Sequence, residues 1–201
     1  MLFVQGASRG IGLELVAQLL LRRPRARVFA SCRDPNGAVD LQALASIHGD
    51  RLRPLALDVT QEPSIAAAAR SIAAETDRLD LVLNVAGVLH GESFSPEKKL
   101  DHVDPEALRT VFEVNAFGPL LVAKHFHGFL RHDQRSVFAS LSARVGSISD
   151  NRLGGWYAYR ASKAAQNMFT KNIAIELGRL APQSIVVGLH PGTVATQLSQ
   201  P

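Results

Sequence analysis

Residues 2–12 of this 201-residue chain read LFVQGASRGIG, and this stretch decides the fold. The first four residues form an apolar run typical of a buried strand, and three glycines follow it, Gly6, Gly10 and Gly12. Apolar residues then recur at helical spacing as far as Leu19. Glycine allows a tight turn with positive φ, and the first turn of a helix offers free N–H groups to phosphate. A strand, a glycine turn and a helix in this order therefore predict a nucleotide-binding unit.

The alternation of strand and helix continues along the chain. After a first strand at Leu2–Gln5 we expect strands at Arg27–Ser31, Leu52–Leu57, Leu79–Val85, Ser136–Leu141 and Ser184–Leu189. We expect further helices at Ile65–Ala74, at Pro105–Leu130 with a bend at Gly118-Pro119, and at Tyr157–Leu180. Strands rich in Val, Leu and Ala that alternate with helices indicate a parallel sheet covered on both faces. The predicted fold class is α/β: a doubly wound parallel sheet, or Rossmann fold, with three α/β/α layers in a single domain over residues 1–201.

Composition excludes several classes of protein. Hydrophobic residues make up 46% of the chain, enough for one sizeable core, and a single cysteine, Cys32, excludes an intramolecular disulfide framework. No apolar run approaches the roughly 18–20 residues of a membrane span. The N-terminus lacks the charged and apolar regions of a signal peptide. We therefore expect a cytoplasmic protein without a membrane partner.

The positive net charge of +4 does not by itself indicate nucleic-acid binding. The densest group of arginines, at 22–27, follows an expected helix, where cations are favoured by the helix dipole. Aromatic residues are only 6% of the chain and none lies among those arginines. His125 and His127 point to different faces of their helix, and no metal-ligand motif is present. We expect neither a nucleic-acid partner nor a metal.

Chemistry is expected where the strands end, because open α/β sheets bind ligands beyond the carboxyl ends of their strands. One candidate pair there is Tyr159 and Lys163, which share a helix face at a spacing of four residues. A nearby ammonium lowers the pKa of a phenol and makes it a usable acid or base, so we expect Lys163 to lower the pKa of Tyr159. Tyr157 competes for this role, but it is not four residues from Lys163. Ser142 ends the strand before this helix and is either a turn serine or a third member of the site.

Asn115 lies inside an otherwise apolar helix, where it lowers helix propensity and needs hydrogen-bond partners. Taken alone, it is more typical of a satisfied polar group in the core. A functional role becomes the better interpretation only in combination with the other motifs.

These motifs together resemble the short-chain dehydrogenase/reductase family. The matching segments occur in the family's order over nearly the whole chain: GASRGIG at 6–12, Asp58-Val59, NVAG at 84–87, Asn115, Ser142, YRASK at 159–163 and Pro191-Gly192. The stretch from Ser142 to Tyr159 is similar to the C-factor and sniffer-type carbonyl reductases, which share its longer spacing of 17 residues. Two positions depart from the family pattern. Gln5 replaces a threonine and Val85 replaces an asparagine.

The resemblance implies hydride transfer between a nicotinamide cofactor and a carbonyl or alcohol substrate. It assigns catalytic roles to Asn115, Ser142, Tyr159 and Lys163. In that assignment Tyr159 exchanges the proton, Lys163 lowers its pKa and binds the nicotinamide ribose, Ser142 orients the carbonyl and Asn115 completes a proton relay. It implies cofactor contacts at Gly6, Ser8, Arg9, Gly10, Ile11, Gly12, Arg33, Asp58, Val59, Asn84, Ala86, Gly87, Tyr159, Lys163, Pro191, Gly192, Val194 and Thr196.

The end of the second strand favours NADP over NAD. NAD-binding folds usually have an acidic residue there for the ribose 2′-OH, whereas this strand is followed by Arg33. A guanidinium suits the 2′-phosphate of NADP through bidentate charge-assisted bonds, and Arg9 is a candidate second cation. Asp34, one position further on, is evidence for NAD. We expect NADP.

The resemblance raises three further expectations. Family members continue beyond the Pro191-Gly192 turn with a substrate-covering segment and a further strand, so a C-terminal strand is expected to be missing here and the substrate stays unidentified. Two long helices per subunit pack against a second copy in many members, so a homodimer is expected. The alternative function is a non-catalytic NADP-binding regulatory or signalling protein on the same fold.

Overall fold

The computed structural model describes residues 1–192 and 194–196, and its centre is one parallel sheet of six strands. The strands are β1 (Leu2–Gln5), β2 (Val28–Cys32), β3 (Leu52–Ala56), β4 (Leu81–Asn84), β5 (Ser136–Leu141) and β6 (Ser184–Leu189). Their spatial order is β3-β2-β1-β4-β5-β6, so the chain reverses direction across the sheet between β1 and β4. This order confirms the doubly wound parallel sheet.

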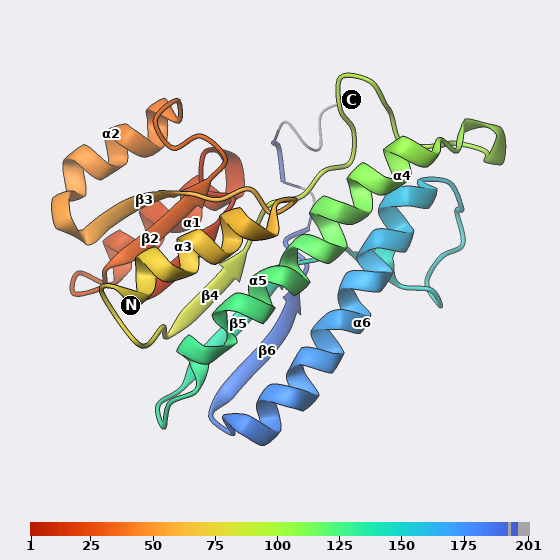
Figure 1. Ribbon diagram of the computed structural model, residues 1–201. Coiled ribbons are helices and arrows are strands. Elements are labelled where there is room, and N and C mark those ends of the chain that lie inside the picture. Colours follow the sequence, from red (N-terminus) through yellow and green to blue (C-terminus); the bar gives the residue numbers. More distant parts are fainter. Residues whose placement is uncertain (193, 197–201) are drawn as a thin grey trace.

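Helices cover both faces of the sheet, which confirms the three-layer arrangement (Figure 1). One face carries α1 (Gly10–Arg22) and α2 (Val39–His48). The other carries α3 (Glu62–Ala73), α5 (Gly118–Phe126) and α6 (Tyr157–Leu180), with α4 (Pro105–Phe112) beside α6. Short 3-10 turns lie at Gly49–Arg51, Leu100–His102, His127–Leu130 and Arg144–Gly146. No helix of the described part is both long and apolar enough to cross a membrane.

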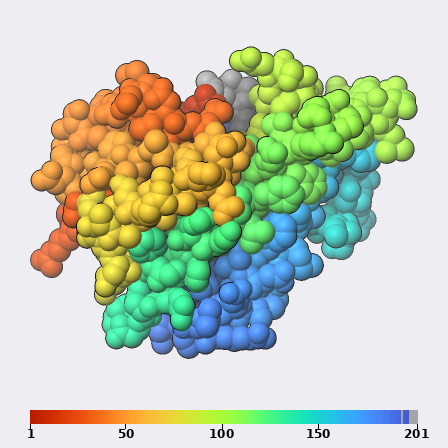
Figure 2. Space-filling model, viewed as in Figure 1, coloured from red at the N-terminus to blue at the C-terminus, as the bar shows by residue number. Residues whose placement is uncertain are grey.

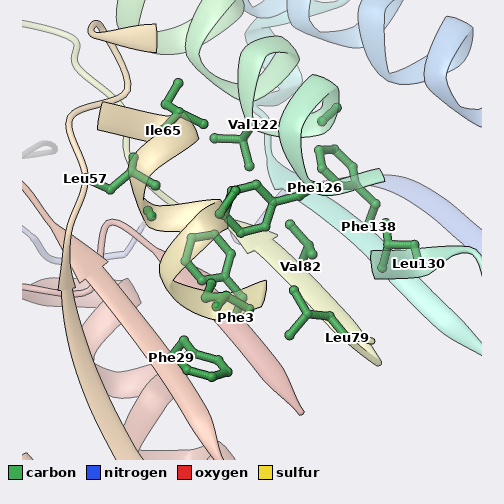
Figure 3. Packing of buried hydrophobic residues seen from close by; sticks show 14 of the residues in the cluster. Phe3, Phe29, Leu57, Ile65, Leu79, Val82, Val122, Phe126, Leu130 and Phe138 are labelled. Carbon is green, nitrogen blue, oxygen red and sulfur yellow. The ribbon is translucent and has the colours of Figure 1, made fainter. Parts of the chain in front are cut away.

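The larger of two hydrophobic clusters fills the space between the sheet and α3, α5 and α6 (Figure 3). Phe3 of β1 stacks on Phe126 of α5 with ring centroids 4.5 Å apart. Full burial of such a side chain stabilises the fold by about 1.5–3 kcal/mol. Phe29 of β2 and Phe138 of β5 extend the cluster across the sheet. The N-terminal and C-terminal halves of the chain therefore share one core, and Figure 2 shows them side by side at the surface.

The expected single helix over Pro105–Leu130 is wrong in its middle. A π-helical turn, Glu113–Phe117, separates α4 from α5 just before the expected bend at Gly118-Pro119. Pro119 has no N–H to donate to the preceding turn, so the regular ladder cannot pass through this point. The other expected elements are present, with ends displaced by at most three residues.

Two details of the helices were not predicted. The helix α2 was missed because Leu41 is its one buried residue, so its apolar residues do not mark a face. Leu177 of α6 is 2% exposed and belongs to the core. Met168 and Ile175 remain exposed on that helix, at 61% and 44%.

Candidate active site

A row of buried polar side chains crosses the sheet near the carboxyl ends of its four inner strands. The strand register places Ser31, Gln5, Asn84 and Ser140 side by side. Asn84 Nδ2 donates to Ser140 Oγ at 3.1 Å, and Gln5 Oε1 accepts a hydrogen bond from Ala86 N at 3.2 Å. Asn84 Oδ1 and Ser31 Oγ are buried without a protein partner. The row marks the sheet edge where a polar ligand or water has unused hydrogen-bonding groups to meet.

The glycine turn lies at this edge, and its glycines are required by space as well as by conformation. Gly6 has φ +85°, and a Cβ there would lie 2.5 Å from Ala86 N. A Cβ on Gly12 would lie 2.0 Å from the carbonyl oxygen of Gly6. The side chain of Arg9, which precedes α1, does not cap this helix, so it leaves the first N–H groups of α1 to other partners. Gln5, in place of the family's threonine, joins this turn to the segment after β4.

Residues predicted from opposite ends of the chain meet at this turn. A Cβ on Gly10 would lie 3.6 Å from Thr196 Cγ2, so Thr196 lies beside the turn. Pro191, Gly192 and Val194 follow β6 and are exposed. Ser8 and Ile11 are half-buried within the turn itself.

The acid and the cation after β2 have different surroundings. The Asp34 carboxylate accepts hydrogen bonds from the N–H groups of Asn36 and Gly37, at 3.1 and 3.0 Å, and so caps its own turn. Arg33 is exposed and forms no hydrogen bond or ion pair with the described residues. The side chain of Arg9, exposed before α1, likewise forms no hydrogen bond or ion pair within the described part. The arginines are available to an anion, whereas Asp34 is already engaged.

Asp58 and Val59 follow β3 and differ in what they offer. Asp58 Oδ1 accepts from Thr60 N at 2.9 Å and from Thr60 Oγ1 at 2.8 Å. Val59 is 6% exposed, and its side chain packs so closely on Gly118 that a Cβ there would lie 2.8 Å away. The Val59 side chain therefore belongs to the core, and only its main chain is left for a ligand.

Tyr159 and Lys163 are brought together on the first turns of α6. The ammonium of Lys163 lies 5.8 Å from the centroid of the Tyr159 ring, and both residues are buried. Burial lowers the pKa of Lys163 to about 8 and raises the pKa of Tyr159. The expected lowering of the Tyr159 pKa is therefore not found in this structure. The reason is geometric: Lys163 Nζ donates to the carbonyl oxygen of Leu141 at 2.8 Å, and burial dominates at the phenol.

Tyr157 occupies a different environment from Tyr159. It lies at the start of α6 and is 36% exposed, whereas Tyr159 is 9% exposed. Trp156 meets the Tyr159 ring edge-on, with centroids 6.3 Å apart. Tyr159 is thus the tyrosine enclosed beside Lys163.

Ser142 lies directly after β5, but the structure does not join it to Tyr159 by a hydrogen bond. Its hydroxyl donates to Asn167 Oδ1 at 2.7 Å, four residues beyond Lys163 on α6. Its main-chain N–H donates to the carbonyl of Leu189 at the end of β6. Ser142 therefore ties the ends of two strands to the helix that carries Tyr159.

Asn115 is fully buried in the π-helical turn, and its side chain is completely engaged. Its Oδ1 accepts from Val88 N and its Nδ2 donates to Val88 O, both at 2.8 Å. Nδ2 also donates to Ser162 Oγ at 3.2 Å, next to Lys163. The side chain thus fastens the segment after β4 to α6, which agrees with the interpretation as a satisfied polar group.

The whole chain, residues 1–201, matches the family model for short chain dehydrogenases. The chain belongs to the short-chain dehydrogenase family. It is therefore an oxidoreductase by family, and the resemblance deduced from its motifs is confirmed.

Relatives of this short-chain dehydrogenase include carbonyl reductases of known structure. The NADPH-bound carbonyl reductase from chicken fatty liver is 34% identical, with a TM-score of 0.89, over 100% of this chain and 82% of that one. The carbonyl reductase Sniffer of Drosophila melanogaster is 27% identical, with a TM-score of 0.87, over 98% and 82% of the two chains. A cyclopentanol dehydrogenase of Comamonas is 34% identical over 200 residues, which are 98% of this chain and 74% of the relative.

Two residues of this short-chain dehydrogenase touch the site and were missed from the sequence. Gln166 Oε1 accepts a hydrogen bond from Lys163 Nζ at 3.0 Å. The buried carboxylate of Glu97 accepts from Ala158 N, with both oxygens at 3.3 Å, and so caps the start of α6. The spacing of three residues from Lys163 was a usable signal for Gln166. Glu97 lies in an irregular segment, and no local pattern indicated its contact.

In the described ranges no three His, Cys, Asp or Glu side chains are placed to hold a metal ion.

Proposed function

We propose that this short-chain dehydrogenase is an NADP-dependent enzyme that interconverts a carbonyl compound and its alcohol. The observation that carries the proposal is the enclosed Tyr159–Lys163 pair, which packs against the end of β5, at the sheet edge where the glycine turn lies. The NADPH bound to the chicken carbonyl reductase and the alcohol acted on by the Comamonas relative support the choice of cofactor and substrate class.

Features of this chain fit a dinucleotide with a 2′-phosphate. The cradle at Gly6–Gly12 leaves room for a pyrophosphate against main-chain N–H groups, and the unpaired Asn84 Oδ1 offers a further hydrogen-bond acceptor at the same edge. Arg33, helped by Arg9, would hold the 2′-phosphate through charge-assisted hydrogen bonds. Bound NADPH would supply the hydride for the carbonyl carbon.

The chain's own residues would supply the proton and the orientation. Tyr159 would deliver a proton from its hydroxyl to the substrate oxygen, and a positive Lys163 beside it would stabilise the phenolate that results. Ser142 would orient the carbonyl after its hydroxyl turns from Asn167. Asn115 would hold Val88 and Ser162 in place around the pair.

The proposal is tested by following NADPH oxidation with a panel of aldehydes and ketones, and by titrating NADPH and NADH calorimetrically. We expect NADPH to bind about 10- to 100-fold more tightly, because hydrogen bonds to a charged group contribute roughly 1.5–3 kcal/mol. Arg33→Ala should reduce this difference between the NADPH and NADH affinities and leave NADH binding nearly unchanged. Arg25→Ala, an exposed arginine after α1, is the matched control and should leave the difference intact. Equal affinities for NADPH and NADH would contradict the assignment.

A second candidate is a non-catalytic NADP-binding protein. The observations that favour it are the hydrogen bond from Ser142 to Asn167 and the position of the Lys163 ammonium against Leu141. NADPH binding without turnover across the whole panel would support this second function and exclude the first.

We further propose that the molecule is a homodimer that buries the outer side of α6. Met168 and Ile175 lie seven residues apart on this helix, hence on one face, and are exposed. Apolar side chains at helical spacing on an outer face are typical of a second buried contact.

A further inference from the structure

We propose that Gln166 is a positioning residue for Lys163: its amide fastens the ammonium to the end of β5 and so determines how that charge is presented to Tyr159. Part of this inference rests on the proposed function, because it gives Lys163 its role in proton transfer. The contact itself and its effect on Lys163 do not depend on any ligand.

Three hydrogen bonds form a closed triangle around the ammonium. Lys163 Nζ donates to Gln166 Oε1 at 3.0 Å and to the carbonyl oxygen of Leu141 at 2.8 Å. Gln166 Nε2 donates to the same carbonyl at 3.2 Å. The Gln166 amide thus accepts a hydrogen bond from the ammonium through its oxygen. Through its nitrogen it donates to the Leu141 carbonyl, which is the second acceptor of the ammonium. Leu141 precedes Ser142, so the triangle also joins α6 to the strand that carries Ser142.

The triangle is buried and electrically neutral apart from the ammonium. Lys163 is 3% exposed and Gln166 is 2% exposed, so water does not replace a lost partner readily. No carboxylate of the described residues forms an ion pair with Lys163. Because only neutral oxygens accept hydrogen bonds from the ammonium, the stability of the charged form of Lys163 depends on each of them.

Few other ionisable groups influence Lys163. On its own helix the Tyr159 phenol lies beside it. Among the elements packed against α6, Arg144 of the turn after β5 is paired with Asp150, and Glu106 of α4 is paired with Arg109. On α5, Lys124 and His125 are both engaged by Glu62 of α3. Burial lowers the pKa of Lys163, and none of these charged groups forms an ion pair with it.

Removing the acceptor at position 166 and adding a negative charge there should therefore shift the pKa of Lys163 in opposite directions. Gln166→Met keeps the length of the side chain but removes the acceptor, which disfavours the ammonium and lowers the pKa of Lys163. Gln166→Glu keeps the shape and places a carboxylate at the same position, which favours the ammonium and raises that pKa. The Gln166→Met arm is the decisive one: a carboxylate raises the pKa of any nearby ammonium, whereas an amide that only fills space predicts no lowering in Gln166→Met.

The experiment is an NMR titration of the cofactor-free protein labelled with ¹³C at lysine Cε. Lys163 is the buried member of five lysines, and Lys163→Met identifies its signal. We expect Gln166→Met to lower the pKa of Lys163 by about one pH unit or more, a tenfold change in ionisation, and Gln166→Glu to raise it. As a control, Gln42→Met removes a half-buried glutamine of α2, on the other face of the sheet, and should leave the pKa of Lys163 unchanged.

If Gln166→Met does not fold, Gln166→Asn serves instead. It shortens the side chain, withdraws the amide from the ammonium and should also lower the pKa of Lys163.

A kinetic arm separates this inference from the proposed function. With NADPH and 4-nitrobenzaldehyde, the reduction rate should fall at high pH as Lys163 loses its proton. That fall should shift to lower pH in Gln166→Met and to higher pH in Gln166→Glu. Absence of turnover would count against the proposed function but not against the role of Gln166. The NMR titration would then decide whether Gln166 positions Lys163. Shifts of the same sign, or no shift, in the titration would overturn the role of Gln166.

Discussion

At the scale of single residues, Tyr157 and Tyr159 give the sharpest comparison, because they lie two positions apart and differ in enclosure. Tyr159→Phe removes one hydroxyl from the buried pair, whereas Tyr157→Phe removes one from an exposed position. We expect Tyr159→Phe to lower the reduction rate by at least about 10²–10⁴-fold, the usual contribution of general acid catalysis. NADPH affinity should be unchanged in both variants. Full turnover in Tyr159→Phe with loss in Tyr157→Phe would show that the roles are reversed.

The burial of Lys163 has a cost in stability that depends on pH. Its pKa is lowered from the ordinary 10.5 to about 8, so between these values the unfolded chain holds a proton that the folded chain has released. The free energy of unfolding therefore rises with pH across this window, and the full cost is present below pH 8.

Lys163→Met should therefore abolish activity yet stabilise the fold at pH 7, by an upper bound of about 3 kcal/mol. The advantage should shrink as the pH rises from 8 toward 10. Leu141 keeps an amide donor from Gln166 in this variant, whereas Gln166 Oε1 loses its donor, which reduces the gain below this bound. Thermal melts from pH 6.5 to 10 measure the effect, with the exposed Lys171→Met as the control. A variant less stable than the parent at pH 7 would contradict the burial cost.

At the scale of elements, the start of α6 depends on a residue from elsewhere in the chain. Trp156 precedes the helix in a left-handed conformation, φ 50°, and provides no side-chain cap. Glu97 supplies that cap through its carboxylate at Ala158 N, and its main-chain oxygen accepts from Trp156 N. An acid is also favoured by the positive end of the helix dipole. The element that carries Tyr159 and Lys163 is therefore held at its first turn by Glu97.

Glu97→Ala should lower the free energy of unfolding by about 1–2 kcal/mol, the upper range for loss of an N-cap. The variant removes both the hydrogen-bond acceptor for Ala158 N and the carboxylate that the helix dipole favours. Glu97→Gln keeps an acceptor oxygen and should lose less. Urea denaturation measures both, and Glu92→Ala, an exposed acid of the same irregular segment, is the control. Equal stabilities for Glu97→Ala and the parent would mean that α6 needs no such cap.

At the scale of the whole molecule, the proposed dimer makes a direct prediction about mass. Light scattering at micromolar concentration should give about twice the 21.7 kDa of one chain. Met168→Glu combined with Ile175→Glu should give the monomer mass, because charge on an apolar interface is costly to bury. Ile47→Glu, on the exposed side of α2 at 77% exposure, should not change the mass. A parent protein that runs as a monomer would refute the dimer.

Much of the molecule could be predicted from local patterns. β1, β5, β6 and α6 have the bounds expected from the sequence, because apolar runs and helical periodicity depend on residues close together in the chain. The glycine turn and the Tyr159–Lys163 pair follow from spacing in the same way. The helix α2 could not be found so, because it lacks an apolar face. Gly118-Pro119 marked the break before α5, but its π-helical form, in which Asn115 contacts Val88, was not visible in the sequence.

The sequence by itself thus determined the α/β order, the glycine turn before α1 and the residues that gather at the carboxyl edge of the sheet. Only the tertiary structure decided what those residues touch. Lys163 meets Leu141 22 residues away, Asn115 meets Ser162 47 residues away and Glu97 meets Ala158 61 residues away. The reason is physical. Helix and strand patterns come from neighbours along the chain, whereas burial, hydrogen-bond partners and pKa shifts come from segments that meet only when the sheet and its helices are packed.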